Sequence, residues 1–151
     1  MEALLKASKT SRKIYLEFFD KYSLEQMNIV PVKFSNNIIW NIGHIIAAQQ
    51  SLVYKISSLP MQISEEFFDR YKPGTKPMAT VSQNEAEEIK SFLISLINQT
   101  ETDLANGEFV SFTERTTITG FHLGNLEDTL EFNNYHEGIH MGFIKSIGRF
   151  V

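Results

Sequence analysis

The segment IIWNIGHIIAAQQ, residues 38–50, decides the fold of this chain of 151 residues. Its large apolar side chains point to nearly every side of a helix with 3.6 residues per turn, and not along one stripe. With Ser35 and Asn36 as candidate caps, the apolar pattern predicts a helix over about residues 37–58. A helix that is apolar all round is buried against other elements. We therefore expect this helix to be mostly buried.

Three other segments have helical periodicity, and they cover about residues 2–22, 83–105 and 125–148. The segment 83–105 opens with Ser82 and Glu85 at capping-box spacing and ends before an Asn-Gly pair. The stripe of 2–22 contains Leu4, Ala7, Ser11, Ile14 and Phe18, widened by Leu5, Tyr15, Phe19 and Tyr22. The stripe of 125–148 contains Thr129, Phe132, His136, Ile139, His140, Phe143 and Ile147. Four helices of about 20 residues predict an all-α four-helix bundle.

The connections between these helices are less regular. A helical turn is expected before Pro31, a short helix at Ser64–Tyr71, and a short extended piece within residues 107–124, which are rich in Thr and Phe. No internal repeat is visible. A chain of this length with 42% hydrophobic residues can bury one sizeable core, so we expect a single domain over residues 1–151.

The composition excludes several classes of protein. Because the chain has no cysteine, any metal site must use nitrogen or oxygen ligands. The net charge is −4 and the basic residues are scattered singly, which argues against nucleic-acid binding. No segment reaches the roughly 20 apolar residues of a membrane span, and the N-terminal sequence lacks the apolar stretch of a secretory signal. We expect a cytoplasmic protein that binds neither nucleic acid nor membrane.

The sequence HEGIH, residues 136–140, has the His-Glu-x-x-His pattern of zinc metalloproteases. His136 and His140 share one helix face, so both could bind one ion at about 2.0 Å. The alternative is that they are buried histidines satisfied by hydrogen bonds. A protease would need a third ligand after the motif, but only MGFIKSIGRFV follows, with no histidine or acidic residue. The protease interpretation is therefore disfavoured, and a third ligand must lie upstream.

His44 and His122 are the two upstream histidines. His122 lies about 14 residues before His136, roughly 20 Å of helix rise, which is too far unless its loop folds back. His44 and His140 are each about 11 Å from an end of their helices, so they lie at similar height if the two helices are antiparallel. This condition favours an up-down-down-up bundle with a long crossover between its second and third helices.

Two motifs resemble those of the DinB/YfiT-like superfamily. These are Trp-Asn-x-Gly-His within residues 38–50 and His-Glu-x-x-His-x-Gly-x-Ile at residues 136–144, and the resemblance covers nearly the whole chain. It implies an up-down-down-up four-helix bundle, commonly dimeric, with a divalent metal held by His44, His136 and His140. Relatives of known activity include bacillithiol S-transferases and mycothiol-dependent maleylpyruvate isomerases.

Five neighbours of these histidines have two interpretations each. Trp40, Asn41 and Asn133 are candidates for lining a cofactor or substrate pocket, while core filling is the alternative for Trp40, and the two asparagines could instead orient the ligands. Glu137 is a candidate general base, with a structural salt bridge as its alternative. Gly43 suggests close approach of another element or a packing notch.

Three histidine ligands leave a fourth coordination position open, which is typical of catalytic metal sites. Zinc and nickel both suit imidazole ligands. The leading interpretation is a metal-dependent enzyme of unassigned small-molecule substrate. The resemblance implies transfer of a low-molecular-weight thiol as its leading reaction class, and it implies a homodimer. The alternatives are a non-catalytic bundle that binds a small ligand or a partner, with a structural or vestigial histidine site, and a metal-dependent hydrolase. With an ordinary histidine pKa near 6.5, we expect metal loss below about pH 6.

Overall fold

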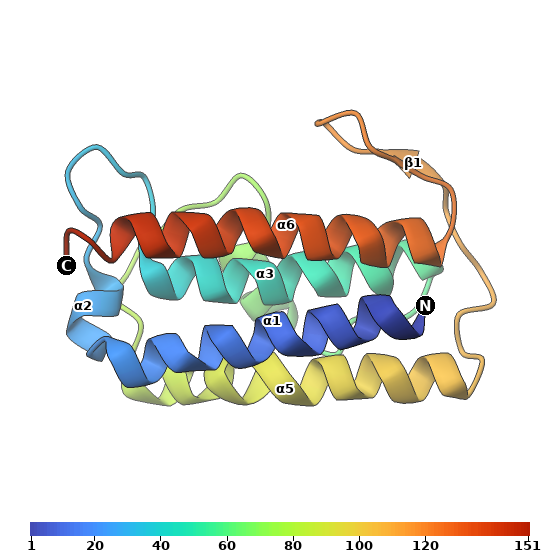
Figure 1. Ribbon diagram of the computed structural model, residues 1–151, viewed down its shortest axis with the longest axis horizontal. Helices are drawn as coiled ribbons and strands as arrows, with labels where there is room; N and C mark the ends of the chain where they lie inside the picture. Colours follow the sequence, from blue (N-terminus) through green and yellow to red (C-terminus); the bar gives the residue numbers. More distant parts are fainter.

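A computed structural model describes residues 1–151 and shows four long helices joined by shorter elements (Figure 1). The long helices are α1 (Glu2–Lys21), α3 (Ile38–Val53), α5 (Gln83–Ala105) and α6 (Leu126–Ile147). The shorter elements are α2 (Leu24–Asn28), the 3-10 helix η1 (Lys55–Ser57), α4 (Glu65–Tyr71), and the strands β1 (Arg115–Thr116) and β2 (His122–Leu123). The prediction of an all-α protein is confirmed, and the expected extended piece is an antiparallel hairpin with Arg115 opposite Leu123.

The four long helices lie side by side, and their directions are visible from the change of colour along each of them. α1 and α6 run one way, and α3 and α5 run the other way (Figure 1). α6 packs on both α3 and α1, while α5 packs on α1 and α3. Residues 54–82, which include α4, return the chain along the length of the bundle between α3 and α5.

α3 is the buried helix of the bundle, as its apolar pattern predicts. Every residue from Ile38 to Gln50 is buried. The buried side chains of Asn41, His44, Gln49 and Gln50 all have hydrogen-bond partners inside the protein, and Gln49 for example donates to Thr100 of α5 at 2.9 Å. The indole nitrogen of Trp40 has none. Because nearly all of these polar groups are paired, enclosing the helix leaves few buried groups unsatisfied.

The helix caps differ in detail from the sequence-based prediction. The cap of α3 is Asn37, one residue after the nearer candidate, and its side chain accepts a hydrogen bond from the backbone of Trp40. Ser82 caps α5 as predicted, but the capping box is only half formed. The carboxylate of Glu85 instead accepts a hydrogen bond from the Tyr71 hydroxyl and pairs with Arg70. This contact fastens the end of α4 to the start of α5.

The buried faces of α1 and α6 also differ from the predicted stripes. α1 is rotated about its axis relative to the predicted stripe, and its buried side chains are Leu5, Ser8, Arg12, Tyr15 and Phe18. On α6, Ile139 and Phe143 are 39% and 47% exposed instead of lying in the core. The α1 stripe was mispredicted because a charged side chain occupies its centre, where a hydrophobic pattern expects none.

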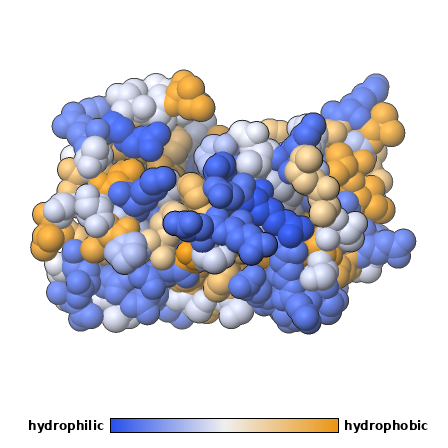
Figure 2. Space-filling view, turned by 180° about the vertical axis from the view of Figure 1, so that it is seen from behind, coloured by the Kyte–Doolittle hydropathy of each residue, from blue (hydrophilic) through white to orange (hydrophobic).

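The outer surface carries mixed groups. Seen from the side opposite to Figure 1, hydrophilic groups cover most of the middle of the molecule, and hydrophobic groups gather toward its two ends (Figure 2). None of the helices combines the length and the hydropathy needed to cross a membrane.

Candidate metal centre

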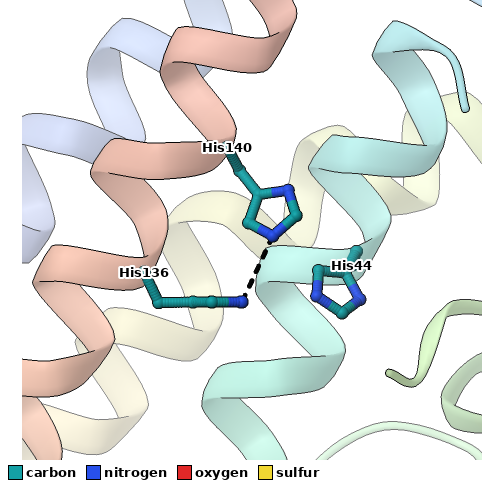
Figure 3. A group of neighbouring side chains, drawn as sticks. All are labelled: His44, His136 and His140. Atoms are coloured by element: carbon teal, nitrogen blue, oxygen red, sulfur yellow. Dashed lines mark hydrogen bonds between the residues drawn. The ribbon is translucent and has the colours of Figure 1, made fainter. Parts of the chain in front are cut away.

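Three of the four histidines meet between α3 and α6. His44 comes from α3, and His136 and His140 come from successive turns of α6 (Figure 3). One ring nitrogen of each lies within 4.8 Å of the others. Residues more than ninety positions apart in the sequence are thus brought together by the packing of two antiparallel helices.

A hydrogen bond to Asn41 fixes the tautomer of His140. Nδ1 of His140 lies 2.7 Å from Oδ1 of Asn41. The amide nitrogen of Asn41 donates to the carbonyl oxygen of Asn37 at 2.7 Å, so its oxygen must face the imidazole. Nδ1 of His140 therefore carries the proton, and Nε2 keeps a free lone pair. Asn41 orients a candidate ligand, the alternative that the sequence left open for it.

A backbone carbonyl fixes the tautomer of His44 in the same way. Nδ1 of His44 lies 2.7 Å from the carbonyl oxygen of Tyr71, which can only accept, so Nε2 of His44 has the free lone pair. Trp40 stacks on the His44 ring, with centroids 4.8 Å apart and planes 12° apart. Gly43 makes room for α4, since a Cβ atom there would lie 2.5 Å from the Tyr71 ring. Close approach is therefore the reason for this glycine.

His136 completes the cluster. Its Nε2 lies 3.2 Å from Nε2 of His140. Two nitrogens bound to one tetrahedral ion at about 2.0–2.1 Å would be about 3.3 Å apart. Nδ1 of His136 is buried without a hydrogen-bond partner. The three imidazoles are a donor set that suits a divalent metal ion, and the spacing of the His136 and His140 nitrogens matches such an ion, so this site could hold one.

The surroundings keep all three imidazoles neutral. Burial, with the neighbouring His44 as a secondary cause, lowers the pKa of His136 to about 4. Burial also lowers the pKa of His140 to about 3, with His136 and His44 as secondary causes. The pKa of His44 is lowered by burial against the opposing effect of its bond to Tyr71. Protons should therefore displace a bound metal ion only at a lower pH than the value near 6 that an ordinary histidine pKa predicts.

Glu137 faces away from the histidines toward α1. Its carboxylate forms a buried ion pair with Arg12 at 2.8 Å and accepts a hydrogen bond from Asn133 at 2.8 Å. The exposed fractions of the Arg12 and Glu137 side chains are 1% and 0%. The backbone carbonyl of Glu137 accepts a hydrogen bond from the Tyr15 hydroxyl. These contacts support the salt-bridge interpretation of Glu137, and they place Asn133 in this network.

A pocket of about 270 Å³ opens beside the cluster, and His44 and His136 form part of its wall. The rest of the lining is formed by Ala48, Ser51, Leu52, Pro73, Arg115, Thr117, Ile118, Thr119 and Phe132. Trp40, Asn41 and Asn133 do not belong to this wall, because Trp40 packs against His44 and both asparagines are fully buried. Sequence reasoning missed the part contributed by the hairpin.

The hairpin folds back along α6 (Figure 1). Phe121 packs on Phe132 and Tyr135 of α6, with ring centroids 5.1 Å and 4.9 Å apart. This contact brings residues 115–119 to the pocket. His122 nevertheless stays outside the cluster, because its Nε2 lies 3.0 Å from the carboxylate of Glu114.

Comparison with known proteins identifies the family of this chain. No curated protein matches the chain. Residues 7–144 match the DinB superfamily, a span that includes all three clustered histidines. The chain therefore belongs to the DinB superfamily.

Proposed function

We propose that this protein is a metal-dependent enzyme that joins a low-molecular-weight thiol to a small electrophilic substrate. The observation that supports it best is the convergence of three neutral imidazoles beside a pocket. Nε2 of His44, His136 and His140 would hold zinc or nickel, which both suit imidazole. A bound divalent ion supplies Lewis-acid chemistry, which lowers the pKa of a thiol and makes it nucleophilic near neutral pH.

The protein's own groups position the reactants. Asn41 and the Tyr71 carbonyl hold two imidazoles in the tautomer that offers Nε2. Ala48, Leu52 and Phe132 give the pocket an apolar wall that excludes water from the electrophile. In the transfer, the thiol loses its proton to solvent, its sulfur forms a bond to the electrophilic carbon, and the leaving group departs with its electron pair.

The alternative functions have less support. A metal-dependent hydrolase needs a general base near the metal, but Arg12 and Asn133 occupy the carboxylate of Glu137. A non-catalytic binding protein would use the same pocket, so only a measurement of activity distinguishes it from an enzyme.

The test compares the wild type with two histidine variants. Metal content is measured after loading with zinc or nickel at pH 7.5, and thiol transfer is followed with 2-mercaptoethanol and monobromobimane. His44→Ala should lose both bound metal and rate acceleration, whereas His122→Ala, which alters the exposed histidine outside the cluster, should keep both. Full metal binding by His44→Ala would reject the site, and metal binding without acceleration for a panel of thiols would favour the non-catalytic alternative.

The proposal extends to the assembly. The helix directions in Figure 1 support an up-down-down-up bundle. Beside the histidines, α6 exposes the large side chains of Tyr135, Ile139 and Phe143, which are 49%, 39% and 47% exposed. Apolar groups gathered on one helix face are typical of association surfaces. We propose that this face contributes to a homodimer, and sedimentation of Ile139→Glu against the wild type tests it.

A further inference from the structure

Arg115 is the single charged side chain in the wall of the pocket, since the two histidines there are neutral. It stands on β1 opposite Leu123, which is 1% exposed and anchors the hairpin in the core. No protein group makes a hydrogen bond or ion pair with the Arg115 side chain. The nearest acidic residue in sequence, Glu114, pairs with His122 instead. The guanidinium is therefore free to bind a ligand.

The rest of the pocket is suited to a small, uncharged part of a ligand. Its polar groups, apart from Arg115 and the histidines, are the hydroxyls of Ser51, Thr117 and Thr119, and no carboxylate lines it. Its volume of about 270 Å³ lies just below the range of about 300–1,000 Å³ for drug-sized ligands. A positive charge without a counter-charge, at the edge of an otherwise neutral pocket, selects an anionic ligand.

We propose that Arg115 binds a carboxylate on the thiol substrate, so that the substrate is a small anionic thiol. This inference rests on the proposed function, since it assigns the histidine side of the pocket to the sulfur. A guanidinium offers two parallel donors that match the two oxygens of a carboxylate. One ligand can contact both regions because His44, His136 and Arg115 line the same small pocket.

The experiment measures thiol binding to zinc-loaded protein by calorimetry. The probes are 3-mercaptopropionate and 6-mercaptohexanoate, the methyl ester of each, and the cationic thiol cysteamine. Two acid lengths are used so that one can reach from the histidines to Arg115. We expect the better acid to bind about five- to tenfold more tightly than its ester, a modest ratio because the arginine is solvent-exposed. Cysteamine should bind more weakly than either ester, and the preference for the acid should fall with added salt.

Variants separate Arg115 from the overall charge of the protein. Arg115→Gln should bind acid and ester equally, and Arg115→Lys should retain part of the preference. Arg149→Gln, which removes an exposed arginine at the other end of α6, should behave as the wild type. Equal binding of acid and ester by the wild type, or an unchanged preference in Arg115→Gln, would overturn the inference while leaving the proposed function intact. Absence of all thiol binding to zinc-loaded wild type would overturn both.

Discussion

The hydrogen bond between Asn41 and His140 gives the sharpest test of the candidate metal centre. Asn41 is fully buried, and its Oδ1 lies 2.7 Å from Nδ1 of His140. Asn41→Leu keeps the volume but removes the acceptor that holds the tautomer. Loss of such a partner behind a metal-binding histidine typically weakens metal affinity 10- to 100-fold, which is about 1.4–2.7 kcal/mol. We expect zinc affinity to fall by this factor.

Folding stability must be separated from this effect, because the variant also leaves buried donors and acceptors without partners. Each such group costs about 1–3 kcal/mol of stability. Gln49→Met is the matched control, since it removes a buried amide from the same helix about 12 Å away. Gln49 bonds to Thr100 of α5 at 2.9 Å and does not touch the histidines. Both variants should lower the free energy of unfolding of the metal-free protein, and only Asn41→Leu should lower zinc affinity.

Zinc affinity is measured at pH 7.5 by competition with a chromophoric chelator, and unfolding by urea titration of the metal-free protein. A folded Asn41→Leu protein whose zinc dissociation constant stays within twofold of the wild type would refute the assigned tautomer. Equal losses of affinity in both variants would show that the effect is a general consequence of lost stability.

Three further predictions concern stability. Because burial lowers the pKa of His136 to about 4, this histidine binds a proton more tightly in the unfolded chain than in the folded protein. Its contribution to folding stability should therefore be complete above pH 6.5 and be lost as the pH falls toward 4. Urea unfolding of the metal-free protein at pH 7.5, 6 and 5 measures this loss. Gly43→Ala should destabilise by about 1–3 kcal/mol through overpacking, whereas Gly142→Ala, with open space around it, should stabilise by about 0.5–1 kcal/mol in the same assay. Arg12→Met should lower the free energy of unfolding by about 3–5 kcal/mol, measured by heat or urea, and adding Glu137→Met should restore most of this loss. If the effects of the two substitutions simply add in the double variant, the two side chains are not coupled as a pair.

The histidine cluster could be predicted from the sequence because helix geometry determines it. The spacing of His136 and His140 fixes their common face, and the distance of His44 from its helix end fixes its height. The groups that orient these rings cannot be found from helix geometry. The carbonyl of Tyr71 has no sequence signal, since every residue carries one. The role of Asn41 could only be stated as one of two alternatives, because its rotamer depends on the carbonyl of Asn37.

The hairpin was beyond sequence reasoning for a different reason. Its return to the pocket depends on contacts between Phe121 and two aromatic rings of α6, which follow no helical or strand periodicity. The content of segment 107–124 suggested extended structure, but its position relative to the bundle depends on tertiary contacts, namely these aromatic rings and the buried side chain of Leu123. Arg115 therefore carried no functional signal in the sequence, although it completes the pocket wall.

The rotation of α6 about its axis connects these observations. Successive residues on a helix are about 100° apart, so Glu137 faces α1 when His136 and His140 face α3. The ion pair with Arg12 fixes one side of α6, and the Asn41–His140 bond fixes the other. Rotation by one residue would break both contacts and separate the imidazoles. A buried ion pair adds little net stability over apolar residues. We infer that the Arg12–Glu137 pair instead fixes the rotation of α6 at which the three imidazoles converge.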